Sequence, residues 1–115
     1  MFASVSAAWA EESLTFYSNE GDAYVGIFNE NGAVLTSQYP KSWFHGEPYQ
    51  DLQVHTKPAI LYLGKDCDAV HNEYGEGSWS GANGGFGAQF GDHVIFFGRQ
   101  EVFGDQFAKC YGVQE

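Results

Sequence analysis

Apolar and polar residues alternate along the middle of the chain with the two-residue period of β-strands. Asn31-Gly32 separates two such runs, and an Asn-Gly pair in this position predicts a type I′ hairpin turn. A register centred on that turn pairs Phe28 with Leu35, Gly26 with Ser37 and Tyr24 with Tyr39 on one face, and puts Val25, Ile27, Val34 and Thr36 on the other. The two runs therefore predict an antiparallel strand pair with one buried face.

Two further Gly-Asp pairs indicate hairpin corners. The first, Gly91-Asp92, places Phe90 opposite His93, Ala88 opposite Ile95 and Phe86 opposite Phe97. The second, Gly104-Asp105, lies in a similar Phe-Gly-Asp context, and we expect it to be another corner. Strands are also predicted at residues 14–18, 51–55 and 59–63, whereas residues 68–73 could hold a turn of helix.

The spacing of these elements predicts an all-β fold. About eight or nine short strands at intervals of about 8–12 residues are typical of a small antiparallel meander that forms a barrel or a sandwich. Both architectures remain open at this point. The chain has 115 residues and shows no internal boundary, so residues 11–115 are expected to form one domain.

Two segments, residues 39–50 and 66–87, interrupt the alternation and are predicted to be long loops. Loops of more than about 12 residues in a compact domain are often functional. They contain the residues that we expect to bind a ligand, five aromatic and four acidic: Trp43, Phe44, Tyr49, Tyr74, Trp79, Asp66, Asp68, Glu73 and Glu76. The alternative is that the rings fold inward and fill the ends of a small barrel. If they bind, alanine at Trp43 or Trp79 should weaken binding and leave the melting temperature nearly unchanged.

Composition supports short strands and tight turns, because aromatic residues make up 17% of the chain and are accompanied by 15 glycines. The formal net charge is −10, which disfavours nucleic acid and anionic lipid as partners. It favours a basic protein, a cation, or solubility alone. No apolar run approaches the roughly 20 residues of a membrane-spanning helix.

The first residues resemble the end of a secretory signal peptide. An apolar, small-residue run ends at Ala8-Trp9-Ala10, the A-x-A pattern of a cleavage site, and polarity changes at Glu11. The Lys or Arg that normally begins such a signal is missing, so a cloning boundary or a misplaced start is the alternative. A signal peptide at this position would direct the protein to the periplasm or outside the cell, with residues 1–10 removed.

The two cysteines, Cys67 and Cys110, predict one disulfide in an exported chain. It would close a loop of about forty residues and contribute about 3–4 kcal/mol on the chain-entropy model. Free buried thiols or a metal pair are alternatives, although neither cysteine has a second ligand at zinc-finger spacing.

Other chemistry is not indicated by spacing. The histidines, His45, His55, His71 and His93, form no metal motif, and Asp66-Cys67-Asp68 lacks the glycine of a calcium loop. Gly77-Ser78-Trp79-Ser80-Gly81 has Trp where a nucleophile elbow has Ser. Gly84, Gly85 and Gly87 match no phosphate-binding pattern and suggest a bulge, a barrel corner or a close approach. We therefore expect no catalytic residue, metal or cofactor, although two of the fifteen acids, with or without a histidine, could meet in an unrecognised hydrolase site.

A short motif resembles one in the bacterial inhibitors of c-type lysozyme, which are small exported β-barrels. Ser80-Gly81-Ala82 is similar to the start of the family's Ser-Gly-x-x-Tyr motif, with Gly84 in place of Tyr. The family's Trp-x-Lys-Gly element is absent, and Phe97-Gly98-Arg99 is its nearest equivalent. The resemblance implies a periplasmic inhibitor of a basic enzyme. The residues alone predict a non-catalytic domain that binds a protein or a glycan.

Overall fold

The computed structural model describes residues 13–47, 50–82, 84–102 and 104–111. Within these ranges the chain forms ten strands and one 3₁₀ helix: β1 (Ser13–Tyr17), β2 (Ala23–Asn29), β3 (Gly32–Ser37), β4 (Lys41–Glu47), β5 (Gln50–Lys57), β6 (Ile60–Gly64), β7 (Asp68–His71), β8 (Gly75–Ala82), β9 (Gly85–Phe90), β10 (His93–Gly98) and η1 (Asp105–Cys110). None of the helical structure in this part of the chain is long and apolar enough to cross a membrane.

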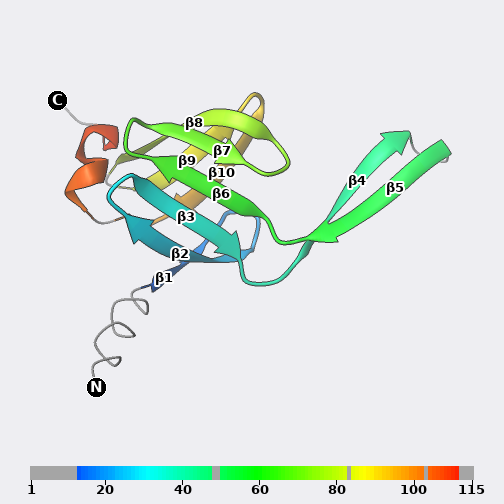
Figure 1. Cartoon of the computed structure of the whole chain (residues 1–115), viewed down its shortest axis with the longest axis horizontal. Coiled ribbons are helices and arrows are strands. Elements are labelled where there is room, and N and C mark those ends of the chain that lie inside the picture. The colour runs from blue at the N-terminus through cyan, green and yellow to red at the C-terminus, as the bar shows by residue number, and fades with distance from the viewer. Residues whose placement is uncertain (1–12, 48–49, 83, 103, 112–115) are drawn as a thin grey trace, which may run out of the picture.

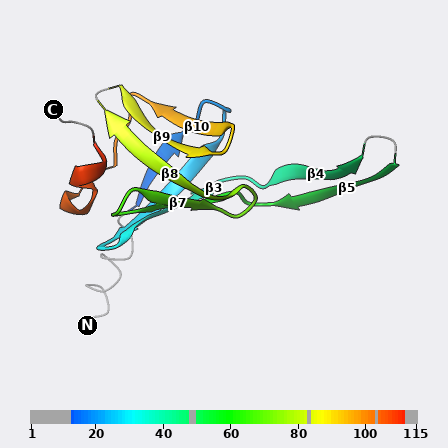
Figure 2. The same cartoon turned by 90° about the horizontal axis from the view of Figure 1, so that it is seen from above.

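Eight of the strands form one antiparallel sheet that curls into a nearly closed barrel, in the order β1-β2-β3-β6-β7-β8-β9-β10. The other two, β4 and β5, pair only with each other and project from the barrel as a separate hairpin (Figure 1). Figure 2 shows the same projection from above. The all-β prediction is confirmed, with a barrel as its form.

Side-chain amides join the two edge strands of the barrel. Gln100 accepts a hydrogen bond from the backbone N–H of Tyr17 at 2.7 Å and donates one to its carbonyl at 2.8 Å. Asn19 does the same for Phe96, donating from its backbone N–H at 2.7 Å and accepting on Oδ1 at 2.9 Å. Both amides satisfy backbone groups that an open edge would expose to other chains.

The core follows from strand alternation. On β2 and β3, Tyr24 and Leu35 face inward and are fully buried, whereas Ile27 on the opposite face is exposed. Phe86 and Phe97, paired across β9 and β10, stack with ring centroids 4.6 Å apart. Large rings thus fill the interior that the alternating pattern creates.

Of the two predicted hairpin registers, one is confirmed and the other is wrong. The pairing around Gly91-Asp92 is confirmed. At the first hairpin the faces are correct but the register is wrong by two residues, because Asn29 pairs with Gly32 and the turn begins one residue earlier. Oδ1 of Asn29 accepts hydrogen bonds from the N–H groups of Asn31 and Gly32 at 2.8 and 3.1 Å, which fixes the earlier turn. Gly32 is therefore a strand residue rather than a turn residue. Glycine is required there because a Cβ would collide with the carbonyl oxygen of Leu63.

Both segments predicted to be long loops are mostly strands, so that prediction is wrong. Residues 39–50 contain β4 and lead into β5, and residues 66–87 contain β7, β8 and the start of β9. The turn of helix expected at residues 68–73 is also wrong, because Ala69 and His71 point inward and alternate with outward residues in β7. Glycine and contiguous aromatic residues hid the alternation in these segments.

One end of the barrel is closed by η1, at the end opposite the hairpin (Figure 1). The corner predicted at Gly104-Asp105 is wrong, because Asp105 begins this 3₁₀ helix. Phe107 of η1 is fully buried, and Cys110 forms the predicted disulfide with Cys67, with Cα atoms 5.4 Å apart. This disulfide is compatible with an oxidising, extracellular compartment. We call this region the disulfide end.

Candidate functional site

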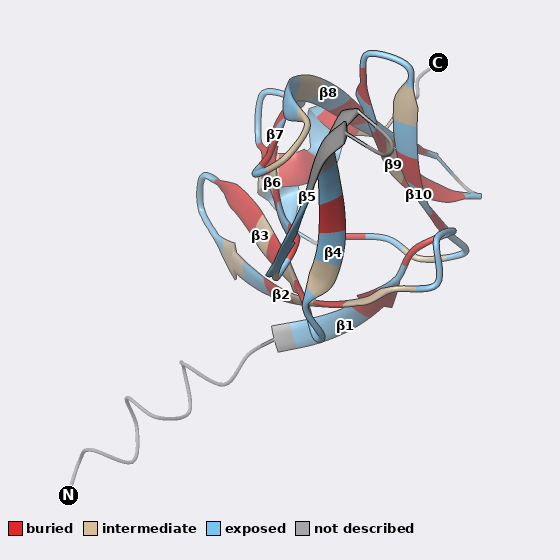
Figure 3. Cartoon of the chain, turned by 90° about the vertical axis from the view of Figure 1, so that its right-hand side faces the viewer, coloured by how far each residue is buried: buried red, intermediate tan, exposed pale blue. Residues whose placement is uncertain are grey.

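The opposite end of the barrel, from which the hairpin projects, combines titratable and aromatic side chains, and we call it the hairpin end. Figure 3 views the molecule from this side, with β4 and β5 in front of the barrel and a buried segment on β4. That segment is Trp43, whose side chain is 9% exposed although its neighbours on β4 face solvent. Trp43 therefore anchors the hairpin against the barrel.

Six side chains form a closed circuit of contacts at this end, which we call the mouth ring: Glu20, Lys41, Trp43, His71, Tyr74 and His93. The ring centroids of Trp43 and His71 are 5.5 Å apart, those of His71 and Tyr74 4.4 Å, and those of Tyr74 and His93 4.1 Å. His93 Nε2 lies 2.8 Å from a carboxylate oxygen of Glu20, and Lys41 Nζ lies 3.2 Å from the other. Lys41 completes the circuit 5.1 Å from the centroid of Trp43.

The turn between β1 and β2 presents two acids to Lys41. Ser18 Oγ accepts hydrogen bonds from the N–H groups of Glu20 and Asp22 at 3.2 and 3.3 Å, which holds this turn in place. Asp22 Oδ2 lies 2.8 Å from Lys41 Nζ. Burial alone lowers the pKa of Lys41, but its hydrogen bonds to Asp22 and Glu20 outweigh that effect and raise the pKa above its ordinary value. Lys41 therefore stays charged and fixes the root of β4.

His71 is neutral and points into the barrel with its side chain almost fully buried. Burial, and to a lesser extent the neighbouring Lys41 and His93, lower its pKa from 6.5 to about 4. Its Nδ1 accepts hydrogen bonds from the N–H groups of Glu73 and Tyr74 at 2.9 and 3.3 Å. An accepting Nδ1 requires the proton of the neutral ring to be on Nε2, so Nε2 is a donor.

Three buried donors at this end have no hydrogen-bond partner within the described part of the chain: His71 Nε2, Trp43 Nε1 and Tyr24 Oη. Burial raises the pKa of Tyr24 to about 12, so its phenol keeps its proton. Unpaired buried donors are costly and tend to occur where structure serves function. Among the described residues, the hairpin end therefore has more buried donors without a hydrogen-bond partner than the disulfide end.

The hairpin itself presents an apolar pair to solvent. Phe44 on β4 lies directly opposite Val54 on β5, and their side chains are 65% and 54% exposed. At the hairpin root, Lys57 pairs in register with Lys41, and its Nζ lies 2.5 Å from Glu73 on the barrel. Acids of the barrel thus hold the lysines at both strands of the root, while Phe44 and Val54 stay exposed.

The structure gathers four of the nine predicted binding residues at the hairpin end: Trp43, Phe44, Glu73 and Tyr74. Trp43 and Tyr74 contact each other with centroids 5.5 Å apart. Phe44 is exposed and faces away from the barrel, because it follows the buried Trp43 in a strand.

The other predicted residues are elsewhere. Trp79 is 3% exposed and lies in the core against Phe107, so we do not keep it as a binding residue. Asp66 forms an ion pair with Lys109 of η1 at 3.1 Å, at the disulfide end, and Asp68 begins β7 beside Gly64. Glu76 is exposed on β8. Tyr49 lies outside the described residues.

The sequence did not predict that Glu20, Lys41 and His93 would be neighbours in one site. Glu20 and His93 come from turns 73 residues apart, and no local pattern links them. Lys41 and Lys57 offered the only local signal, because lysines flank the aromatic segment that forms the hairpin. A hairpin prediction over residues 41–57 would have placed them side by side.

The site shows neither a metal cluster nor an activated nucleophile. Among the described residues, no group of three or more His, Cys, Asp and Glu side chains could hold a metal ion. Nε2 of His93 lies against the carboxylate of Glu20, and neither His71 nor His93 is hydrogen-bonded to a described hydroxyl or thiol. The arrangement combines a cluster of charged and aromatic side chains at the barrel end with an exposed apolar pair, Phe44 and Val54, on the hairpin.

Comparisons with protein-family models, curated proteins and solved structures found no match for the chain. The three residues that resemble the lysozyme inhibitors, Ser80, Gly81 and Ala82, lie in β8 on the barrel wall. Ser80 faces solvent, and Gly81 lies against the ring of Tyr111.

Proposed function

We propose that this chain is an exported, non-catalytic binding protein that uses the β4–β5 hairpin and the barrel end beneath it to contact a partner protein. The observation that carries the proposal is the hairpin, which pairs with no other strand of the barrel in the described residues and presents Phe44 and Val54 to solvent. Exposed apolar groups on a projecting element are typical of contact surfaces, and aromatic residues contribute strongly to binding.

The partner is expected to be basic. The net charge of −10 favours the approach of a positively charged protein over long distances and accelerates association at low salt. Glu20 and Asp22 already bind Lys41, so the short-range contacts belong to the hairpin and the longer-range attraction to the whole chain. A glycan is the alternative ligand, and its binding would be nearly insensitive to salt.

Export is supported by the signal-like residues 1–10 and by a disulfide suited to an oxidising compartment. The periplasm or the extracellular medium is therefore the proposed location. Intact mass of the protein isolated from its native cells tests this: we expect a chain that begins at Glu11 with Cys67 and Cys110 bonded. Retained residues 1–10 together with two free thiols would contradict it.

Capture from periplasmic extract or culture medium tests the binding surface. The bait is the chain from Glu11, and the test variant carries Phe44→Ala and Val54→Ala. The control variant is Ile27→Ala, because Ile27 is similarly exposed but lies on β2. We expect one basic protein to bind the parent and the control at low salt, with an association rate that falls steeply as salt rises, and to be lost with the double variant. Equal capture by all three, or binding indifferent to salt, would contradict the proposal.

A sharper form of the proposal is inhibition of a basic enzyme such as c-type lysozyme. The charge, the disulfide-bonded barrel and the Ser80-Gly81-Ala82 resemblance favour this form. A lysozyme activity assay with increasing amounts of the parent and of the Phe44→Ala, Val54→Ala variant tests it directly. Saturable inhibition by the parent alone would support it, and full lysozyme activity at excess parent would rule it out.

A further inference from the structure

The outer face of β8, β9 and β10 carries a trough that lies apart from the hairpin end. Three cross-strand rows point outward there: Ser78–Gln89–Val94, Ser80–Gly87–Phe96 and Ala82–Gly85–Gly98. At Gly85 and Gly87 the central strand has no side chain to fill the space between its neighbours. The strand sequence itself therefore creates a depression along β9.

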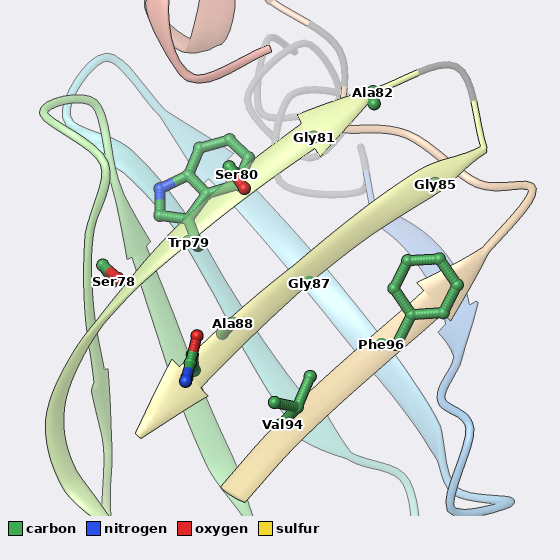
Figure 4. A pocket seen from close by; sticks show the side chains of 11 residues that line it. Ser78, Trp79, Ser80, Gly81, Ala82, Gly85, Gly87, Ala88, Val94 and Phe96 are labelled. Atoms are coloured by element: carbon green, nitrogen blue, oxygen red, sulfur yellow. The ribbon is translucent and has the colours of Figure 1, made fainter. Parts of the chain in front are cut away.

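The depression has a volume of about 350 Å³. This lies at the lower limit of the roughly 300–1,000 Å³ typical of small-ligand sites. Figure 4 shows Ser78 and Ser80 on β8 and Val94 and Phe96 on β10, on either side of Gly85 and Gly87. A Cβ at Gly87 would come within 3.2 Å of the Phe96 ring, so glycine is what lets the ring lean over the floor.

The two walls of the trough differ in chemistry. Ser78 and Ser80 present hydroxyls that have no hydrogen-bond partner among the residues described, and both side chains face solvent. Gln89 of β9 closes the polar side, and its Nε2 donates to the carbonyl of Gly91 at 3.1 Å. Across the floor, the Phe96 ring is 42% exposed and Val94 is similarly exposed.

No residue that lines the trough is charged, in a chain whose net charge is −10. Anions gain nothing from such a site, and cations have stronger attractors elsewhere on the protein. An extended peptide could not add to the sheet here, because β9 already pairs on both sides with β8 and β10. A ligand with an apolar face and a rim of hydroxyls matches both walls.

We propose that this trough binds a neutral saccharide, with one sugar ring stacked on Phe96 and its hydroxyls hydrogen-bonded to Ser78, Ser80 and Gln89. The ring of Phe96 supplies the apolar platform, and the serine wall supplies donors and acceptors that fix the orientation of the sugar. The site is independent of the hairpin end, so it stands whether or not the hairpin binds a protein.

Titration of the ¹⁵N-labelled chain with maltotriose, cellotriose and triacetylchitotriose, each alone, tests the proposal. We expect at least one trisaccharide to shift the amide signals of Ser80, Gly87 and Phe96 in a saturable way, with the hairpin signals unmoved. Phe96→Ala should weaken that binding about tenfold through loss of the stacking platform. Ser80→Leu should abolish it by filling the trough from the polar wall.

Ile27→Ala is the matched control, because Ile27 is also an exposed apolar residue but lies on the outer face of β2. It should bind like the parent, and thermal melts of all three variants show which of them keep the parent fold. Because Phe96→Ala and Ser80→Leu change the trough from opposite walls, either folded variant is a sufficient test. Absence of saturable shifts in the parent with all three sugars, shifts confined to the hairpin, or parent-like affinity in a folded Phe96→Ala or Ser80→Leu variant would overturn the proposal.

Discussion

The two ends of the barrel are built around tryptophans that differ in one respect. At the disulfide end, Nε1 of Trp79 donates a hydrogen bond to the carbonyl of Gly64 at 2.8 Å, and its ring packs on Phe107 of η1. At the hairpin end, Nε1 of Trp43 has no partner in the part of the chain that the structure describes, and its ring packs on His71 and Tyr74. The N–H of Trp79 therefore has a hydrogen-bond partner, and that of Trp43 has none among the described residues.

The same contrast extends to the surroundings of each ring. The disulfide end is closed by a covalent bond and by apolar contacts, which stabilise the barrel. The hairpin end keeps titratable groups and unpaired donors together and projects its hairpin into solvent. Natural proteins tolerate such local conflicts mainly at functional sites. The difference predicts that stability depends more on the disulfide end, and it supports the proposal that the hairpin end binds a partner.

The largest expected effect comes from opening the disulfide end. In a Cys67→Ser, Cys110→Ser variant, loss of a bridge between residues 43 apart should lower the free energy of unfolding by about 3–4 kcal/mol. Urea unfolding followed by tryptophan fluorescence measures this loss. The parent under reducing conditions should match the variant. A loss below about 1 kcal/mol would show that η1 stays docked without the bond and that the disulfide end is less dependent on it than the comparison implies.

Lowering the pH should reduce the free energy of unfolding through His71, at the hairpin end. Because the folded pKa of His71 is about 4 and its ordinary value is 6.5, the unfolded chain binds more protons than the folded chain between these pH values. Stability from this group is therefore complete above pH 6.5, falls as the pH drops toward 4, and falls no further below that. The total loss is at most about 3 kcal/mol.

Unfolding free energies measured from pH 7 to pH 4 test this, with His71→Gln as the control. The parent should lose stability more steeply than the variant in this range, because glutamine does not titrate. The Cys67→Ser, Cys110→Ser variant should keep the steep parent slope, since its change is at the other end. Equal slopes for the parent and His71→Gln would show that His71 accepts a proton without cost and is not truly desolvated.

Much of the barrel could be predicted from the sequence where alternation is regular. The Gly91-Asp92 hairpin was predicted in register because Phe86, Ala88 and Phe90 alternate without interruption up to the turn. The register at Asn31-Gly32 failed because two local signals compete: the side chain of Asn29 fixes a turn of its own one residue earlier. Strands rich in glycine, such as β8, were not recognised because their inward positions include Gly81 rather than a large apolar residue.

The candidate site was predictable only in part. Trp43 and Tyr74 were identified as binding residues because large aromatic residues in polar segments are unusual, and they do meet at one end. Trp79 has the same sequence signature but lies in the core, since composition cannot say which way a strand residue points. The mouth ring joins turns that are distant in sequence, and only the closed sheet brings Glu20 and His93 together. The trough could not be predicted from the sequence, because its glycine floor forms only when β8, β9 and β10 pair in register.

Phenylalanine in place of each tryptophan gives the smallest effects and the most direct comparison of the two ends. Trp79→Phe removes a buried N–H and leaves the Gly64 carbonyl without its donor, which should cost about 1–3 kcal/mol. Trp43→Phe removes an N–H that has no partner among the described residues, so its cost should be about 1 kcal/mol or less. Urea unfolding of both variants in parallel measures the difference. Equal losses would mean that the Trp43 N–H forms as good a hydrogen bond as that of Trp79, and the contrast between the two ends would fail.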